Sequence, residues 1–192
     1  MRRSRTRERI GLAAVAAVAM TIATASAAAD PVTGGKTVLK PDVDTFEGFA
    51  DMSMSVGATG AARDAVKGVV FPISGGDVRE GPKGSVEHRG GLVFAQNTPG
   101  GEILKLSKFT VRIGAGGKTK LFAKSDHSEI RFLDLDLSDA TIGGSAGTDL
   151  KIKGADATLA KPAAQLFSEV FDFPFRKGIP IGSMNLKATV SG

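Results

Sequence analysis

The sequence predicts a mainly β protein, either an antiparallel β-sandwich or a partly closed barrel, with one short C-terminal helix. Three observations lead to this fold class. From residue 67 onward, apolar and polar residues alternate in a succession of short segments, which is the period of a half-buried strand. Glycine, with 25 of the 192 residues, supplies turns between these segments. Near the end of the chain a single segment has strong helical periodicity instead.

Residues 1–29 have the three parts of a secretory signal peptide. Five arginines lie within the first nine residues, an apolar run follows over Ile10–Ala25, and Ala27–Ala29 are small residues typical of a cleavage site. The apolar run of about 16 residues is shorter than the roughly 20 of a membrane-spanning helix, so a cleaved leader is favoured over an uncleaved anchor. Both the Sec and the twin-arginine routes stay open. We expect one domain at residues 30–192, secreted or wall-associated, with no stable membrane anchor after cleavage.

The first part of that domain is expected to contain a short helix that passes into a strand. Asp44 or Thr45 can cap the helix, and three apolar residues then follow helical spacing: Phe46, Phe49 and Ala50. Apolar residues at 52, 54 and 56 change to alternation, which indicates the strand.

The segments between residues 67 and 159 predict a series of strands. In the first, Pro72 argues for an edge strand or a bulge, and Ser74–Asp77 then predicts a turn. Gly90-Gly91 predicts a sharp bend. Ile103–Ile113 predicts a long strand whose apolar set changes face once, near Leu104. The later strands are expected at residues 118–123, 130–137 and 150–159.

The C-terminal helix is the clearest single element. Pro162 suits its first turn and Pro174 prevents its continuation. Five apolar residues form one stripe along it: Ala163, Leu166, Phe167, Val170 and Phe171. A last half-buried strand is expected to follow over Met184–Val190.

The charge distribution argues against nucleic-acid binding. The formal net charge is +5, but the five arginines of the leader account for most of it. Without residues 1–29, 20 basic side chains face 19 acidic ones, so the domain lacks the excess positive charge that such binding requires.

The motifs argue against an enzyme. Cysteine is absent, which removes disulfides and thiolate chemistry, and H-E-x-x-H does not occur. The one match to G-x-S-x-G, Gly143–Gly147, falls in an expected glycine-rich loop that precedes a strand, not in the strand-to-helix turn that presents a nucleophilic serine. A hydrolase with a facing pair of carboxylates stays as a lower alternative.

Two features could bind a ligand. His88 stands beside a glycine pair, and a neutral imidazole coordinates metals readily, although a histidine bonded at a strand bend is the simpler interpretation. Phe167, Phe171 and Phe175 could form the floor of an apolar pocket for a flat ligand, although such clusters more often belong to a core.

Several segments resemble the HtaA-type (haem-transport-associated) domains of Gram-positive bacteria. The resemblance extends over roughly residues 66–182 and is carried by six segments: Phe71–Gly76, Gly84–Leu92, Leu106–Ile113, Lys118–Ala123, Leu159–Phe167 and Phe175–Gly182. It implies a secreted or surface β-sandwich that captures and relays haem. Characterised members hold the iron with a tyrosine supported by a histidine. His88 falls on the histidine position, whereas this chain has no tyrosine. Other candidate iron ligands are His88 itself or the sulfur of a methionine: Met52, Met54 or Met184.

We therefore expect a secreted, non-catalytic binding module whose ligand is haem or another flat apolar molecule. The alternative is a structural or adhesive protein of the cell envelope that binds another protein or a wall polymer.

Overall fold

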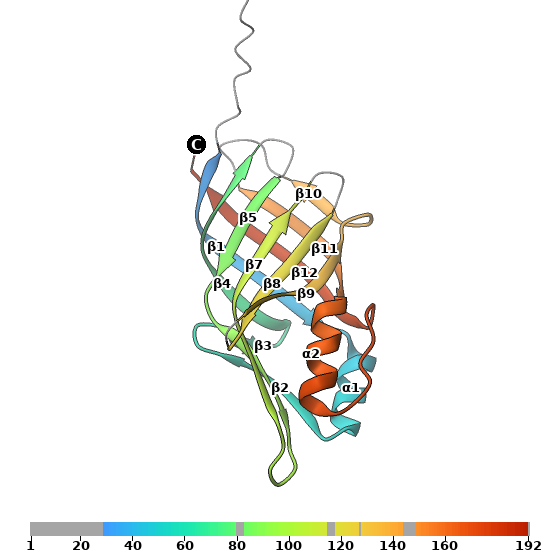
Figure 1. The fold of residues 1–192 in the computed structure, drawn as a ribbon. Coiled ribbons are helices and arrows are strands. Elements are labelled where there is room, and N and C mark those ends of the chain that lie inside the picture. The colour runs from blue at the N-terminus through green and yellow to red at the C-terminus, as the bar shows by residue number, and fades with distance from the viewer. Residues whose placement is uncertain (1–28, 80–82, 115–117, 127, 144–148, 192) are drawn as a thin grey trace, which may run out of the picture.

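The strands close into an antiparallel barrel in the computed structural model, which describes residues 29–79, 83–114, 118–126, 128–143 and 149–191 (Figure 1). The expected signal peptide lies outside these residues, except for Ala29. Each strand of the barrel pairs with the next, and the last pairs with the first. The order is β7 (Ile103–Ile113), β5 (Lys83–His88), β4 (Gly68–Arg79), β1 (Asp30–Pro41), β12 (Pro180–Val190), β11 (Leu150–Leu159), β9 (Ser128–Asp136) and β8 (Thr119–Ser125).

The remaining elements extend the barrel. β6 (Gly91–Gln96) pairs with β7, and β2 (Met54–Thr59) pairs with β6, so that the β6–β7 hairpin projects from one end (Figure 1). Two helices, α1 (Val43–Asp51) and α2 (Lys161–Phe171), lie at that same end. β3 (Arg63–Ala65) pairs with β4, and β10 (Thr141–Gly143) with β11. The predicted mainly β fold is confirmed, and of its two forms the structure has the barrel, which is closed.

The helices form where the sequence places them. α2 has proline in its first turn and ends at Asp172, whose left-handed backbone (φ 49°) stops it before Pro174. α1 is capped two to three residues earlier than predicted. The side chain of Asp42, rather than that of Asp44 or Thr45, accepts a hydrogen bond from the backbone N–H of Thr45 at 3.0 Å.

The predicted turn at Ser74–Asp77 is wrong, because β4 continues through it to Arg79. The glycines serve a close approach between strands instead. Gly76 has a φ of 120°, and a Cβ there would overlap the carbonyl oxygen of Ser85 on β5. Pro72 lies in this interior strand next to a register shift between Ile73 and Gly75, so the bulge is confirmed and the edge position is wrong.

β7 has the predicted bounds, but its change of face occurs at Lys108 and not near Leu104. Leu106 and Phe109 are both buried, and Lys108 between them has a left-handed backbone (φ 50°). The bend predicted at Gly90-Gly91 is confirmed, since β5 ends at His88 and β6 begins at Gly91. β7 pairs with both strands, so its bulge lies where its partner changes from β6 to β5.

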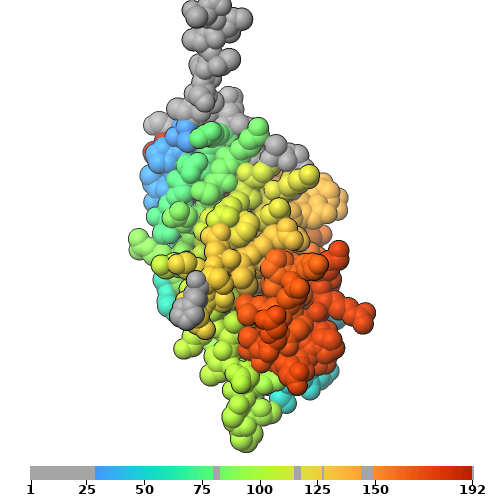
Figure 2. Space-filling model, viewed as in Figure 1, coloured from blue at the N-terminus to red at the C-terminus, as the bar shows by residue number. Residues whose placement is uncertain are grey.

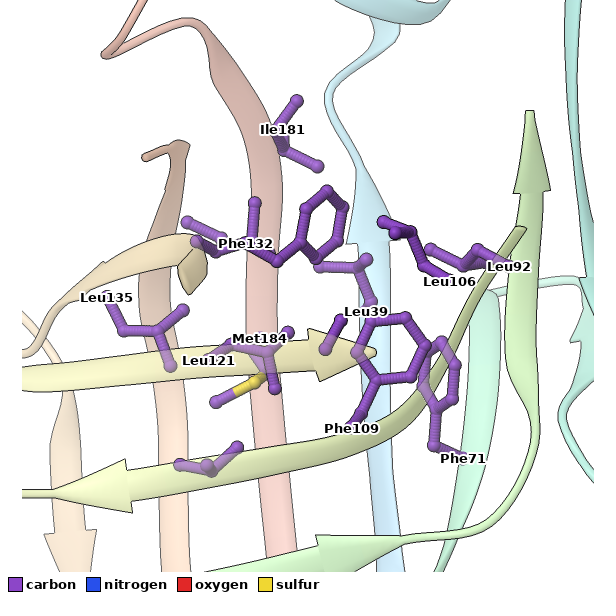
Figure 3. Close-up of a cluster of buried hydrophobic side chains, with 14 of the residues drawn as sticks. Leu39, Phe71, Leu92, Leu106, Phe109, Leu121, Phe132, Leu135, Ile181 and Met184 are labelled. Carbon is purple, nitrogen blue, oxygen red and sulfur yellow. The ribbon is translucent and has the colours of Figure 1, made fainter. Parts of the chain in front are cut away.

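Side chains fill the interior of the barrel, as is usual for eight strands. The rings of Phe71, Phe109 and Phe132 lie close to Leu39 and Met184 in the view of Figure 3. The largest fully buried side chains come from five barrel strands and from α2: Phe132, Phe167, Leu106, Leu133, Ile152, Leu159, Met184, Leu186, Val86 and Val111.

Candidate functional site

His88 lies in the wall of the barrel with both ring nitrogens bonded. It is the last residue of β5, only 5% exposed, and its Nδ1 is 3.1 Å from the carbonyl oxygen of Phe109 on β7. A carbonyl can only accept, so the proton of the neutral ring is on Nδ1. Nε2 then accepts a hydrogen bond from the hydroxyl of Thr37 on β1, at 2.7 Å. The imidazole therefore connects three strands of the barrel.

Burial keeps this imidazole neutral. Desolvation lowers the pKa of His88 to about 4, although the bond to the Phe109 carbonyl acts in the opposite direction. A neutral ring is the form that binds metals, but here both nitrogens already have partners within the fold. The arrangement is that of a structural histidine, unless a ligand displaces Thr37.

The cavity beside His88 is far too small for a macrocycle. It measures about 10 Å³, space for roughly one water molecule. Haem therefore does not fit inside the barrel as it stands. Thr37, whose hydroxyl contacts His88, is also a lining residue of this cavity. Apart from Thr37 and His88, the residues that line the cavity are apolar: Leu39, Phe71, Leu92, Phe109, Leu121, Phe132 and Met184.

An apolar groove opens at the end of the barrel where α1 lies. Its volume is about 280 Å³, near the lower limit for small-molecule sites. Leu39 and Leu92 line both this groove and the cavity of His88, so they separate the two spaces. We call it the mouth groove, and its lining residues are Leu39, Pro41, Phe46, Val56, Asp64, Ala65, Val66, Gly68, Val69, Leu92, Phe94 and Ile181.

Local backbone geometry gives the mouth groove its shape. Gly68 begins β4 with a φ of 114°, and a Cβ there would overlap the carbonyl oxygen of Leu39. The one charged lining residue, Asp64, accepts a hydrogen bond from the backbone N–H of Ala58 at 3.5 Å. Val66 at the rim is fully exposed, which is unusual for a large apolar side chain.

The three predicted phenylalanines pack beneath α2 as part of the core. Phe167, Phe171 and Phe175 are 1%, 3% and 7% exposed, and their rings contact one another. His88 is not among these contacts. Two ring contacts lead toward the mouth groove instead. The ring centroids of Phe167 and Phe94, a groove residue, are 4.7 Å apart. Those of Phe175 and Phe49 are 6.1 Å apart, and the ring of Phe49 in turn contacts that of Phe46 in the groove.

Two further hollows lie on the outer surface. One, of about 350 Å³, borders the outer side of His88 and is lined by side chains of both charges, among them Glu87 and Lys108. The other, of about 700 Å³, is an open depression beside α2 that includes Phe175 and Lys177. In the described part of the chain, three or more His, Asp or Glu side chains nowhere gather in an arrangement for a metal ion.

The mouth groove escaped sequence reasoning because its residues come from six separate segments. Most of them are the apolar positions of strands, which in the sequence look like any core residue. One signal was present: Val66 is a lone large apolar residue in the small and polar stretch Thr59–Lys67. In the structure the side chain of Val66 is exposed and is not part of the core.

Comparison with known proteins identifies the fold. No protein-family model matches the sequence, and none of the curated proteins matches it. Among solved structures, the C-terminal domain of HtaA from Corynebacterium glutamicum matches with a TM-score of 0.68 at 17% identity, over 84% of this chain and 99% of that one. The N-terminal domain of the same protein matches with a TM-score of 0.65 at 14% identity, over the same shares. None of the described helices combines the length and the hydropathy needed to cross a membrane. The chain therefore has the fold of the HtaA domains, as the resemblance in its sequence implied.

Proposed function

We propose that this chain is a secreted, non-catalytic binding module of the bacterial envelope, and that it binds a flat apolar ligand, with haem as the first candidate. The observation that carries the proposal is the mouth groove, an apolar hollow at the end of a closed barrel with a single carboxylate in its lining. A flat apolar molecule gains affinity in such a groove by removing its own surface and that of the lining from water.

The predicted site residues act in this proposal from behind the groove. In this proposal Phe167 holds the ring of Phe94 in position by an edge contact, and Phe175 acts on Phe46 only through Phe49. Phe171 supports both Phe167 and Phe175. His88 fixes the wall beneath Leu39 and Leu92. It becomes an iron ligand only if a bound haem displaces the hydroxyl of Thr37 from Nε2. Met184 lines the small cavity beside His88, so its sulfur becomes a ligand only if that cavity opens to the haem.

Among the described residues, the lining of the groove has no acid–base pair for catalysis. Asp64 is its only ionisable lining residue, and the described carboxylates elsewhere do not enter it. Glycoside hydrolysis requires two facing carboxylates, so this lining favours binding without turnover over a hydrolase of that kind.

Haem titration of the full chain, followed by the Soret band, tests the proposal. Ala65→Trp fills the groove from its exposed edge strand without touching the core, and Thr189→Trp places the same ring on the outer wall, at an exposed position of β12. We expect haem to bind to the wild type and to Thr189→Trp, and to bind at least tenfold more weakly to Ala65→Trp. Equal affinity of the two variants would exclude the mouth groove as the site. In His88→Ala, an altered Soret position would make His88 an iron ligand, and an unchanged one would leave it a positioning residue.

A further inference from the structure

Three lysines lie in one row across the outer wall of the barrel. Lys36 on β1 is directly opposite Lys187 on β12, and Lys187 is directly opposite Lys151 on β11. Opposite residues of antiparallel strands point to the same face, and all three are exposed, so this face is the outer one. We call Lys36, Lys187 and Lys151 the lysine row.

The lysine row is unfavourable for the fold by itself. Adjacent strands are about 4.8 Å apart, and like charges directly opposite each other destabilise a sheet. Lys187 has an ion pair with Asp149, at 3.3 Å. Within the residues that the structure describes, Lys36 and Lys151 have no ion pair at all. One carboxylate therefore offsets three ammonium groups.

The surroundings leave these ammonium groups open to a ligand. The residue paired with Lys36 on its other side is Pro72, and the residue paired with Lys151 on its other side is Gly143, neither of which carries charge. Lys40 and Lys153 add two exposed positive charges on the same strands, and Asp156 on β11 adds one exposed negative charge. This positive face thus contrasts with the near-neutral balance of residues 30–192.

We propose that the lysine row binds a linear polymer that carries a phosphate in each repeat, so that successive phosphates lie along successive lysines. The ligand is a polyanion because negative charges placed beside the row offset the repulsion among its ammonium groups. A lipid surface fits this face less well. Stable attachment to a membrane usually combines charge with inserted apolar groups, and none of the exposed large apolar side chains of the described residues lies on β1, β11 or β12. The lysine row shares no residue with the mouth groove, and this proposal does not rest on the function proposed above.

The test measures binding of poly(glycerol phosphate) to the full chain over a series of salt concentrations. The variant is Lys36→Gln with Lys151→Gln, which leaves the ion pair of Lys187 intact. The control is Lys161→Gln with Lys177→Gln beside α2, which removes the same charge from exposed positions elsewhere. All three proteins keep the arginines of residues 1–9, so these contribute equally to each measurement.

We expect the row variant to bind at least tenfold more weakly at low salt, and its slope of log K against log salt to fall by about 1.5, because two phosphate contacts are lost. The control should keep the affinity of the wild type within about twofold, a margin well below the loss expected for two phosphate contacts. The melting temperature of the row variant at low salt should equal or exceed that of the wild type, since repulsion is relieved.

Three outcomes would overturn the proposal. The first is a wild type that does not bind the polymer, and the second is an equal loss of affinity in the row variant and the control. The third is binding to phosphatidylglycerol vesicles or to duplex DNA that is as tight as binding to the polymer and equally dependent on the row. In that case the face would belong to a membrane or to a nucleic acid.

Discussion

The hydroxyl of Thr37 and the imidazole of His88 meet at 2.7 Å inside the barrel, across the intervening strand β4. On the other side of the ring, the Phe109 carbonyl fixes the proton on Nδ1. The carbonyl is free to accept because β7 bulges at Lys108, where its pairing changes from β6 to β5. The His88 side chain thus donates to the Phe109 carbonyl the hydrogen bond that a neighbouring strand would otherwise provide.

Removing the imidazole should destabilise the barrel. In His88→Ala, the Thr37 hydroxyl and the Phe109 carbonyl lose their partner in a buried site, and a cavity is left, so the free energy of unfolding should fall by about 2–4 kcal/mol. Thr37→Val keeps the shape and leaves only Nε2 unpaired, so it should cost about 1–2 kcal/mol. Urea unfolding measures both. A loss of less than 0.5 kcal/mol in His88→Ala, on the order of a surface substitution, would contradict a structural role.

Stability should fall as the pH is lowered through the range in which an exposed histidine protonates. The unfolded chain takes up this proton near the ordinary pKa of 6.5, whereas the buried ring resists it down to a pKa of about 4. The stabilisation is therefore complete above pH 6.5, declines between pH 6.5 and 4, and is gone below that. The full difference corresponds to about 3 kcal/mol.

The matched control for this pH dependence is His88→Gln, which cannot titrate. The difference in unfolding free energy between wild type and variant removes the contribution of the carboxylates. It should shrink as the pH falls from 6.5 to 4. Two parallel stability curves would show that His88 is not the titrating group.

Two neighbouring glycines should respond in opposite ways to alanine. Gly35 has a φ of 121°, and a Cβ there would overlap the carbonyl oxygen of Lys187, so Gly35→Ala should cost more than about 2 kcal/mol. Gly34 has open space around it and no left-handed backbone, so Gly34→Ala should be neutral or slightly stabilising. Thermal unfolding of Gly35→Ala and Gly34→Ala tests this difference. Equal melting temperatures of the two variants would contradict the close approach of β1 and β12.

Local patterns in the sequence were sufficient for most elements. The stripe of α2 and the alternation of β7 predict their elements closely, because each is determined by one periodic segment. The last strand was predicted from Met184, whereas β12 begins four residues earlier, at Pro180. The prediction of a turn at Ser74–Asp77 was wrong because a glycine pair permits a turn and a close approach between strands equally well. Gly76 shows the second use, which depends on the position of β5.

The candidate site was less predictable because it depends on which segments meet. Leu39, Phe46 and Leu92 are ordinary apolar residues until the barrel end brings them together. Barrel closure itself requires pairings between strands that are not consecutive, such as β5 with β7 and β1 with β12, and no local pattern encodes these or the shift of β7 at Lys108.

The aromatic cluster beneath α2 should couple stability to ligand binding. Phe167 is 1% exposed and contacts the rings of four other phenylalanines, so Phe167→Ala should lower the free energy of unfolding by about 3–5 kcal/mol. Phe173, which is 44% exposed, is the matched control and should cost less than about 1 kcal/mol on substitution by alanine.

The milder Phe167→Leu variant separates positioning from folding. Leucine keeps an apolar side chain beneath α2 but loses the edge contact that holds the ring of Phe94 at 4.7 Å. The variant should stay folded at room temperature. If the contact positions the mouth groove, the variant should bind haem several-fold more weakly, since an edge contact contributes about 0.5–1.5 kcal/mol. Unchanged haem affinity in a folded Phe167→Leu would mean that Phe94 keeps its position without Phe167, and that the cluster serves the core alone.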